Sequence, residues 1–380
     1  MDNKTYDLIA TTVFGLEAVV KKECEDLGFT DIKVSNGKVE FKGNQRDIAR
    51  ANLWLRSSER VLIKLGEFEA KTYDQLYENS KKINYEDFLS KDGKYIVNAK
   101  TVKSKLMSPR DLQSIVKKSV IDRMKKAHII EWFKEDGARF RIEVSLLKDL
   151  ATITLDTSGA GLHKRGYRLD QNQAPMKETL AAALVQLSNW TYERPLVDLF
   201  CGSGTIPIEA ALIGKNIAPG LSRDFDFIKW DFYDKAIFDD EKKIAYESIK
   251  DRKLDIIGFD IDRNAIEIAR SNAYNIALDE DILFITKDMK DVGLKNNFGV
   301  LISNPPYGER LGEKKDLEVI YKNLAILFKK LSTWSFFLIT SDKDFERKVN
   351  KVVDKKRKLF NGRIEVDYYQ YMGIDPNLLK

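Results

Sequence analysis

The sequence predicts an α+β first half followed by a doubly wound α/β domain, in which helices cover both faces of a mostly parallel sheet. Three observations support this fold class. The 380 residues exceed what one ordinary core can organise, so two or three domains are expected. Glycine and polar residues over 158–178 indicate a connector. Beyond the connector, uniformly apolar strands alternate with helices, which is typical of a parallel sheet buried on both faces.

The first half divides into two small α+β units, over residues 1–65 and 66–157. The first unit is expected to hold strands near 6–11, 32–34, 38–41 and 60–68, and helices over 16–27 and 46–52. The second is expected to hold helices over 73–82 and 109–127, and strands over 94–101, 140–146 and 151–156. Ser108 can cap the helix over 109–127 and Pro109 can start it, because both residue types suit a helix N-terminus.

The domain over residues 179–380 shows the regular alternation of an open parallel sheet. Strands are expected over 195–200, 254–260, 282–285, 300–303 and 336–340, and helices over 206–213, 265–276 and 317–331. A long segment over 214–253, rich in charged and aromatic residues, precedes the second strand. Ligands of such sheets bind at the carboxyl ends of the strands, so the residues that follow each strand are the candidates for a site.

The composition excludes several classes of site. Cys24 and Cys201 are the only cysteines, which excludes a disulfide framework or a zinc site of paired thiolates and favours a reducing, cytoplasmic setting. His128 and His163 are the only histidines, so we expect neither a catalytic triad nor a histidine metal site. No run of about 18 apolar residues occurs, so we expect no membrane span and no signal peptide. The 64 basic and 59 acidic residues permit an anionic partner without requiring one.

A glycine turn follows the first strand of the α/β domain, in the sequence from Val197 to Thr205. Gly202 and Gly204 would let the backbone approach a ligand closely, at the point where a doubly wound sheet binds one. A dinucleotide fingerprint would need a third glycine where Pro207 stands, and no P-loop lysine follows, so NAD and ATP sites fit poorly. A turn that serves packing alone is the alternative.

Carboxylates close the next two strands. Asp260 ends the second strand, where it can accept hydrogen bonds from both ribose hydroxyls of a nucleoside. Asp262 is expected to cap the helix that begins at Arg263, and capping is the alternative role for Asp260 as well. Asp288 follows the third strand and could accept from an adenine amino group, although a single Asp there is more often a cap or turn residue.

The fourth strand ends in Ser303-Asn304-Pro305-Pro306-Tyr307, the most specific signal in the chain. An exocyclic amine on a nucleobase is a poor nucleophile, because its lone pair is delocalised into the ring. The Asn304 side-chain carbonyl and the Pro305 backbone carbonyl can accept from its N–H groups and orient the lone pair, while Tyr307 can stack on the base. Adjacent prolines would fix these acceptors in place, and a merely structural proline turn is the alternative.

Together, the three strand-end signals and the Asn-Pro-Pro-Tyr turn make this domain resemble a class I S-adenosylmethionine-dependent methyltransferase, with a Rossmann-like sheet of seven strands. The extended motif from Asn304 to Arg310 resembles the guanine-N2 methyltransferases of ribosomal and transfer RNA. The segments from His163 to Arg168 and from Ala174 to Ala182 match the same family. The first half resembles a ferredoxin-like segment plus a THUMP domain. The likeness is strongest to bacterial 23S rRNA guanine-N2 methyltransferases and spans nearly the whole chain.

The resemblance implies a cofactor, a substrate and a set of site residues. S-adenosylmethionine would be the methyl donor and the N2 amine of a guanosine in 23S rRNA the acceptor, with one methylation expected and no metal. Asn304, Pro305, Pro306 and Tyr307 would be catalytic. The implied cofactor contacts are Asp198, Phe200, Cys201, Gly202, Gly204, Thr205, Asp260, Ile261, Asp288, Met289, Asn304, Lys177 and Thr179.

Basic residues that could hold RNA gather in two places. Between Lys100 and Lys126, nine basic residues face only two acidic ones. A basic helix face follows phosphates without reading sequence, although a merely solvated face has the same pattern. In the connector, basic residues flank Tyr167, a mixture suited to backbone and base contacts. The candidate RNA contacts are Lys103, Lys105, Arg110, Lys117, Lys118, Lys164, Arg165 and Arg168.

Four other functions share part of this pattern. A tRNA guanine-N2 methyltransferase is the nearest alternative. A DNA amine (N6-adenine) methyltransferase would share the cofactor site and the Asn-Pro-Pro-Tyr turn, but not a THUMP-like first half. A non-catalytic RNA-binding ribosome assembly factor would not need an intact Gly202, Gly204 and Asn304. A nicotinamide oxidoreductase is disfavoured by Pro207.

Overall fold

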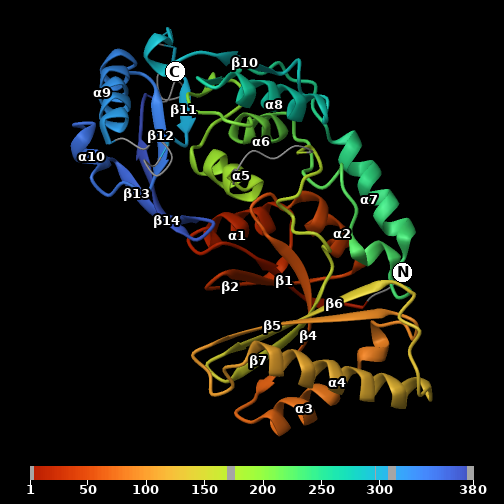
Figure 1. The fold of residues 1–380 in the computed structure, drawn as a ribbon. Helices are drawn as coiled ribbons and strands as arrows, with labels where there is room; N and C mark the ends of the chain where they lie inside the picture. The colour runs from red at the N-terminus through yellow and green to blue at the C-terminus, as the bar shows by residue number, and fades with distance from the viewer. Residues whose placement is uncertain (1–3, 169–175, 296, 307–313, 375–380) are drawn as a thin grey trace. The chain divides into compact units, whose positions relative to one another are not determined.

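The chain folds into two compact units in the computed structural model, which describes residues 4–168, 176–295, 297–306 and 314–374 (Figure 1). The first unit holds residues up to 12, 20–162 and 224–244, and the second holds 13–19, 163–223 and 245 onward. The segment 224–244 comes from the α/β half of the sequence, yet it packs in the first unit. Its Trp230 stacks on Phe140 at 5.3 Å between ring centroids and donates from Nε1 to the Arg139 carbonyl at 2.8 Å.

One sheet of seven strands forms the centre of the first unit, in the order β2-β3-β1-β4-β7-β6-β5. The strands are β1 (Tyr6–Thr11), β2 (Thr30–Ser35), β3 (Lys38–Gly43), β4 (Arg60–Glu69), β5 (Lys94–Val102), β6 (Arg139–Leu147) and β7 (Leu150–Asp156). β5 and β6 are parallel, and the other neighbouring pairs are antiparallel. Because β4 pairs with both β1 and β7, the strands of both expected α+β units belong to this one sheet.

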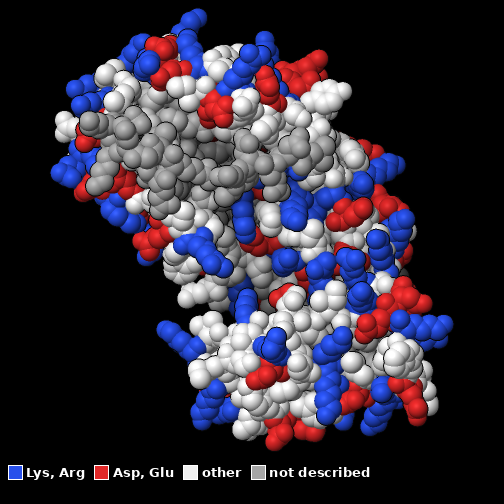
Figure 2. Space-filling model, viewed as in Figure 1, with Lys and Arg blue, Asp and Glu red and all other residues white. Residues whose placement is uncertain are grey.

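Helix α4 illustrates how sequence signals set the helices of the first unit. The Ser108 side chain accepts from the Asp111 N–H at 3.3 Å, and Pro109 begins the helix, as predicted. Its Leu112, Val116 and Val120 are fully buried, while basic and acidic side chains interleave over the surface formed by α3 and α4 (Figure 2). The helices that lie wholly or mostly in this unit are α1 (Glu17–Asp26), α2 (Gln45–Trp54), α3 (Tyr73–Lys81), α4 (Pro109–His128) and α7 (Lys235–Glu247), with 3-10 turns η1 (Tyr85–Asp87) and η2 (Asp226–Lys229).

The sheet of the second unit also has seven strands, in the order β10-β9-β8-β11-β12-β14-β13. The strands are β8 (Leu196–Asp198), β9 (Ile256–Asp260), β10 (Ile282–Thr286), β11 (Val300–Ser303), β12 (Ser335–Thr340), β13 (Lys355–Asn361) and β14 (Ile364–Tyr371). The strands from β10 to β12 are parallel, whereas β14 is antiparallel to both neighbours, so the sheet is mixed. This confirms the predicted mostly parallel sheet of seven strands.

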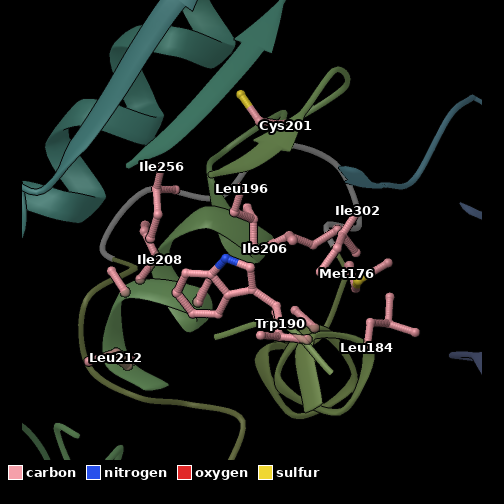
Figure 3. Packing of buried hydrophobic residues seen from close by; sticks show 14 of the residues in the cluster. Met176, Leu184, Trp190, Leu196, Cys201, Ile206, Ile208, Leu212, Ile256 and Ile302 are labelled. Carbon is pink, nitrogen blue, oxygen red and sulfur yellow. The ribbon is translucent and has the colours of Figure 1, made fainter. Parts of the chain in front are cut away.

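Helices cover both faces of the second sheet, as the doubly wound prediction requires. The helices are α5 (Glu178–Leu187), α6 (Thr205–Gly214), α8 (Arg263–Tyr274), α9 (Lys314–Lys330) and α10 (Phe345–Lys348), with the 3-10 turn η3 (Met289–Asp291). One apolar core lies between the sheet and α5, α6 and α8, and a separate core lies between the sheet and α9 and α10. Side chains that meet in the first core include Met176, Trp190, Leu196, Ile206 and Ile302 (Figure 3).

Candidate cofactor and catalytic site

The glycine turn leads from β8 into α6, and both of its glycines adopt a left-handed backbone. Gly202 has φ of +52° and Gly204 has φ of +82°, a region that other residues enter at a cost. A Cβ on Gly204 would lie 2.9 Å from the Phe284 ring and 3.0 Å from the Ala269 Cβ, so close packing requires glycine there. A Cβ on Gly202 would meet no heavy atom of the described residues within 4 Å. The turn is therefore closely packed at Gly204, whereas the described residues leave space beside Gly202.

Asp198, the last residue of β8, lies beneath this turn and is 1 % exposed. Its Oδ1 accepts from the Phe200 N–H at 3.0 Å. Burial raises the pKa of this carboxyl to about 7, against the lowering effect of hydrogen bonds from the Phe200 N–H and the Ser303 hydroxyl, while the charge of Asp260 raises it further. The Asp198 carboxyl therefore holds the backbone at the start of the turn from its buried side.

Asp260 ties the end of β9 to the same turn. Its Oδ2 accepts from the Gly202 N–H and its Oδ1 from the Asp262 N–H, each at 2.9 Å. Asp262 caps α8 by accepting from the Asn264 N–H at 2.8 Å, which confirms its predicted capping role. A carboxylate has about four lone-pair sites, so these two bonds leave Asp260 able to accept from a ligand as well.

Asp288 lies at the end of β10 and caps the turn η3. It accepts from the Lys290 N–H at 3.0 Å and pairs with the Lys290 ammonium at 2.9 Å. Partial burial raises the pKa of Asp288, but hydrogen bonds from the Lys290 backbone and side chain lower it by more, so it lies below its usual value. The carboxyl is consequently ionised and remains an acceptor at neutral pH. The next residue, Met289, is buried, whereas Ile261 after β9 is 71 % exposed.

Strand order places these groups along one edge of the sheet. Parallel neighbours β10, β9, β8 and β11 end beside one another, and Asp288, Asp260, Asp198 and Asn304 follow or close them in that order. At about 4.8 Å per strand, the row from β10 to β11 spans roughly 14 Å. An elongated ligand could therefore contact all four strand ends.

Asn304 follows β11 and carries an unusual acceptor. Its Oδ1 is buried and has no hydrogen-bond partner within the described ranges. Leaving a buried polar atom unpaired costs about 1–3 kcal/mol, so the position is suited to a donor supplied from outside the chain. Pro305 is buried and Pro306 half-buried beside it, while Tyr307 lies outside the described residues.

Ser303, the residue before Asn304, was not singled out from the sequence. Its Oγ accepts from the Leu199 N–H at 2.8 Å and donates to the Asp198 carboxylate. Backbone pairing between β8 and β11 stops at Val197 and Leu301, so the hydroxyl continues the link where the strands separate. This also explains why β8 is shorter than the predicted 195–200. A serine beside a buried strand end was the only sequence signal for this role.

The connector packs on α6, the helix that begins at the glycine turn. Arg165 is 3 % exposed and pairs at 3.4 Å with Glu209 of α6, which is fully buried and also accepts from the Tyr167 hydroxyl at 3.3 Å. Arg168 donates to Thr205 Oγ1 at 2.6 Å and pairs with Glu178 at 3.1 Å. A buried guanidinium already bound to a carboxylate is not available to a phosphate. These ion pairs count against an RNA contact by Arg165 and Arg168, which stays a prediction.

The other residues that were predicted to contact the cofactor from the connector region lie near α6. Met176 and Thr179 are buried, and Lys177 precedes α5 at its N-cap position. The expected matches at Ala174 and Pro175 lie outside the described residues. Three further predicted cofactor contacts lie in the glycine turn. Cys201 is 6 % exposed and its N–H donates to the Phe259 carbonyl, Thr205 is also buried, and Phe200 is half-buried.

The remaining candidate RNA contacts are accessible. Lys103, Lys105, Arg110, Lys118 and Lys164 are exposed, while Lys117 is half-buried with Glu135 at 3.7 Å. Lys103 and Lys105 line an open hollow of about 470 Å³, together with Met107 and Asp149. Lys164 belongs to the second unit and the others to the first.

No helix in the described part of the chain is long and apolar enough to cross a membrane. Among the same residues, no group of three or more His, Cys, Asp or Glu side chains could hold a metal ion. Cys24 and Cys201 are both free, buried thiols.

Family models match three segments of the chain. Residues 165–370 match the RMKL-like methyltransferase domain, residues 7–62 the RlmL ferredoxin-like domain and residues 70–156 the THUMP domain. The chain therefore belongs to the family of THUMP-domain-containing, S-adenosylmethionine-dependent RNA methyltransferases, and S-adenosylmethionine is its cofactor.

Similar proteins cover almost the full length. The chain is 52% identical over 377 residues, covering 97% of it and 96% of the relative, to "Putative RNA methyltransferase YpsC" of Bacillus subtilis (strain 168). The crystal structure of SMU.472 complexed with SAH matches at 44% identity and a TM-score of 0.93, over 98% of this chain and 99% of that one. A predicted N6-adenine-specific DNA methylase from Listeria monocytogenes matches at 48% identity and a TM-score of 0.93, over 97% of both chains.

Proposed function

We propose that this chain transfers the methyl group of S-adenosylmethionine to the exocyclic N2 amine of a guanosine in RNA, with 23S rRNA as the substrate. The observation that supports an amine acceptor most directly is the buried Asn304 Oδ1, which lacks a partner among the described residues. It follows β11, at the edge where the glycine turn and Asp260 also lie. A group that donates N–H bonds is the complement of such an acceptor.

The proposed cofactor contacts follow the order of the strands. The open side of Gly202 would receive the methionine part, Asp260 the ribose hydroxyls and Asp288 the adenine amino group. The fit rests on the space beside Gly202 and on the lone pairs that both carboxylates retain. When bound, the cofactor supplies an electrophilic methyl group on sulfur.

The chain's own contribution is to hold the amine. Asn304 Oδ1 and the Pro305 carbonyl would accept from its two N–H groups, which orients the lone pair on nitrogen. The prolines restrict the backbone at these acceptors, so little reorganisation is needed when the base arrives. Asp198 and Ser303 would position Asn304 relative to the glycine turn, because both accept hydrogen bonds from the backbone at the start of that turn.

An RNA substrate is supported by the first unit. Its THUMP match over 70–156 contains exposed lysines, Lys103 and Lys105 beside a hollow and Lys118 on α4. Basic groups of this kind bind a phosphate backbone. The Bacillus relative is named an RNA methyltransferase and the Listeria one a DNA methylase, so the names of relatives support either nucleic acid. The basic THUMP segment favours RNA, with rRNA the first choice and tRNA the second.

The test supplies labelled S-adenosylmethionine with unmodified 23S rRNA transcript, unmodified tRNA or duplex DNA in parallel, followed by nucleoside analysis. We expect N2-methylguanosine in the 23S rRNA. Label in tRNA alone would replace the rRNA assignment, and N6-methyladenine in DNA would overturn the proposal.

Asn304→Ala tests the mechanism in the same assay. It removes an acceptor used during transfer, so we expect kcat to fall by about 10²–10³ while cofactor affinity by calorimetry stays close to wild type. Near-normal turnover by this variant would eliminate the acceptor role.

A further inference from the structure

The strand order of the second unit limits where a nucleic acid can approach the candidate site. The proposed cofactor contacts occupy the ends of β8, β9 and β10, on one side of β11. On the other side lie β12, β14 and, at the edge of the sheet, β13. A substrate base that reaches Asn304 is therefore expected on the half of the sheet from β11 to β13.

Positive charge is concentrated on this half of the unit. Residues 343–367, named here the basic edge, comprise α10, β13 and the start of β14 and contain nine basic and five acidic residues. This excess of four compares with a net charge of +5 for the whole chain. Blue side chains with red ones between them line the margin over α10 and β13, at the upper left of Figure 2.

Some cations of the basic edge are held by acidic partners. Lys343 pairs with Glu365 at 3.0 Å and with the largely buried Asp367 at 3.2 Å, and Lys358 pairs with Glu365 at 2.5 Å. Lys356 lies 3.9 Å from the Asp367 carboxylate and 5.5 Å from the centre of the Tyr369 ring. These contacts give the hairpin a defined arrangement of side chains.

Other cations are not neutralised. Lys355 and Arg363, at the two ends of the β13 strand and its turn, are exposed and have no ion pair among the described residues. Lys351 lies 4.8 Å from the centre of the Phe328 ring, without a carboxylate partner in the same ranges. Exposed, unpaired cations are the groups that a phosphate can engage without first breaking an ion pair.

The strand register places the basic edge level with β11, the strand that Asn304 follows. Ser303 aligns with Leu338 of β12, Leu338 with Tyr369 of β14, and Tyr369 with Lys356 of β13. Three strand spacings separate Ser303 from Lys356, which is about 14 Å. The hairpin then continues beyond Thr340, the last residue of β12, because residues 364–366 of β14 pair with β13 and not with β12. Its turn, with Arg363, projects at the edge of the sheet where Asn304 lies.

We propose that the basic edge is an RNA-contact surface of the methyltransferase unit, which binds the phosphate backbone next to the nucleotide presented to Asn304. This inference rests on the proposed function, because it assigns a surface to the same RNA substrate. Lys355 and Arg363 provide the contacts, since they are exposed, have no ion pair among the described residues and lie at the two ends of β13 and its turn. Such contacts position the RNA and carry no sequence information.

Lysine on an edge strand has another known use, which is to prevent pairing with a second sheet. The two roles predict different results when charge is removed. Loss of a phosphate contact changes the salt dependence of RNA binding, whereas loss of edge protection promotes self-association.

The test compares two double variants with the same change in charge. Lys355→Gln/Arg363→Gln removes unpaired cations of the basic edge, and Lys250→Gln/Lys253→Gln removes exposed lysines that precede β9 on the other half of the unit. Binding to unmodified 23S rRNA transcript is measured across a salt series, with cofactor affinity as the check on folding.

We expect the basic-edge variant to lose two phosphate contacts. Its log-log salt slope should become less steep by about 1.4–1.8, and its RNA affinity at 0.15 M salt should fall about 15- to 30-fold. The control variant should bind RNA within a few-fold of wild type. Equal effects of both variants, or unchanged RNA binding with new self-association of the basic-edge variant, would overturn the proposal. Wild-type methyl transfer in the same samples tests the proposed function separately, because binding is read without turnover.

Discussion

Ser303→Ala is the sharpest probe of how the candidate site is assembled. The Ser303 hydroxyl accepts from the buried Leu199 N–H at 2.8 Å and donates to the Asp198 carboxylate, which is 1 % exposed. Alanine keeps the backbone and removes both bonds. It leaves a buried N–H without a partner and a buried carboxylate with one donor fewer, directly before Asn304.

The structure sets the size of the effect. An unpaired buried N–H costs about 1–3 kcal/mol, and the bond to a charged group contributes about 1.5–3 kcal/mol. Because the two share one hydroxyl, we expect a loss of about 2–4 kcal/mol in the free energy of unfolding of the second unit. For a unit of this size that corresponds to a fall of roughly 5–15 °C in melting temperature. We also expect weaker cofactor binding and a lower kcat, since Asn304 and the glycine turn lose their shared support.

Ser188→Ala is the matched control. The Ser188 hydroxyl is buried, donates to the Val185 carbonyl at 2.6 Å and accepts from the Trp190 N–H at 3.2 Å, at the end of α5. Its loss should lower the melting temperature without changing cofactor affinity. Melting is followed by circular dichroism, affinity by calorimetry and kcat by labelled methyl transfer. Wild-type kinetics for Ser303→Ala, or an equal kinetic loss for Ser188→Ala, would refute the positioning role of Ser303.

Two further predictions concern charged groups of the same unit. The pKa of Asp198, raised by burial to about 7 from 3.8, means that the folded state binds a proton more tightly than the unfolded state. The contribution of Asp198 to the free energy of unfolding is therefore complete below pH 4, and about 4 kcal/mol of it is lost as the pH rises to 7. Asp198→Asn should remove this pH dependence, which urea titrations at a series of pH values would measure. Arg168→Gln should weaken cofactor binding and leave RNA affinity unchanged, because Arg168 bonds Thr205 and Glu178. Reduced RNA affinity with normal cofactor binding would contradict this and support the RNA contact predicted for Arg168.

Elements with strong local signals were predicted closely. Helix α4 begins at Pro109 and β11 covers Val300–Ser303, as expected from the sequence. The cap at Asp262 and the glycine turn were also recognised, because capping and left-handed turns depend on a few neighbouring residues. Signals of this kind do not require knowledge of the rest of the fold.

Elements without such signals were missed. The first eight residues of α5 are buried, so it has no polar face and no amphipathic period to reveal it. Strand β14 contains Asp367 and Gln370, whose burial depends on pairing with β12 and β13. The polar residues interrupt the apolar run by which buried strands are recognised.

The basic residues of the connector show a different limit of prediction from sequence. Arg165 and Arg168 resemble an RNA-binding cluster in sequence, but both are engaged with carboxylates. Glu209, the partner of Arg165, is 44 residues away in the chain and fully buried in α6. A charged residue in an otherwise apolar helix was the available hint that a buried partner exists.

By itself, the sequence determined the fold class, the methyltransferase family, and the residues that close each strand, because turns, caps and strand patterns are set by neighbouring side chains. Only the tertiary structure decided which of those residues contact one another. It joined Asp198 to Ser303, left Asn304 Oδ1 without a partner among the described residues, and separated buried cations such as Arg165 from exposed ones such as Lys355. The physical reason is that burial and pairing are properties of segments distant in sequence, and they alone determine whether a charge or an acceptor is available to a ligand.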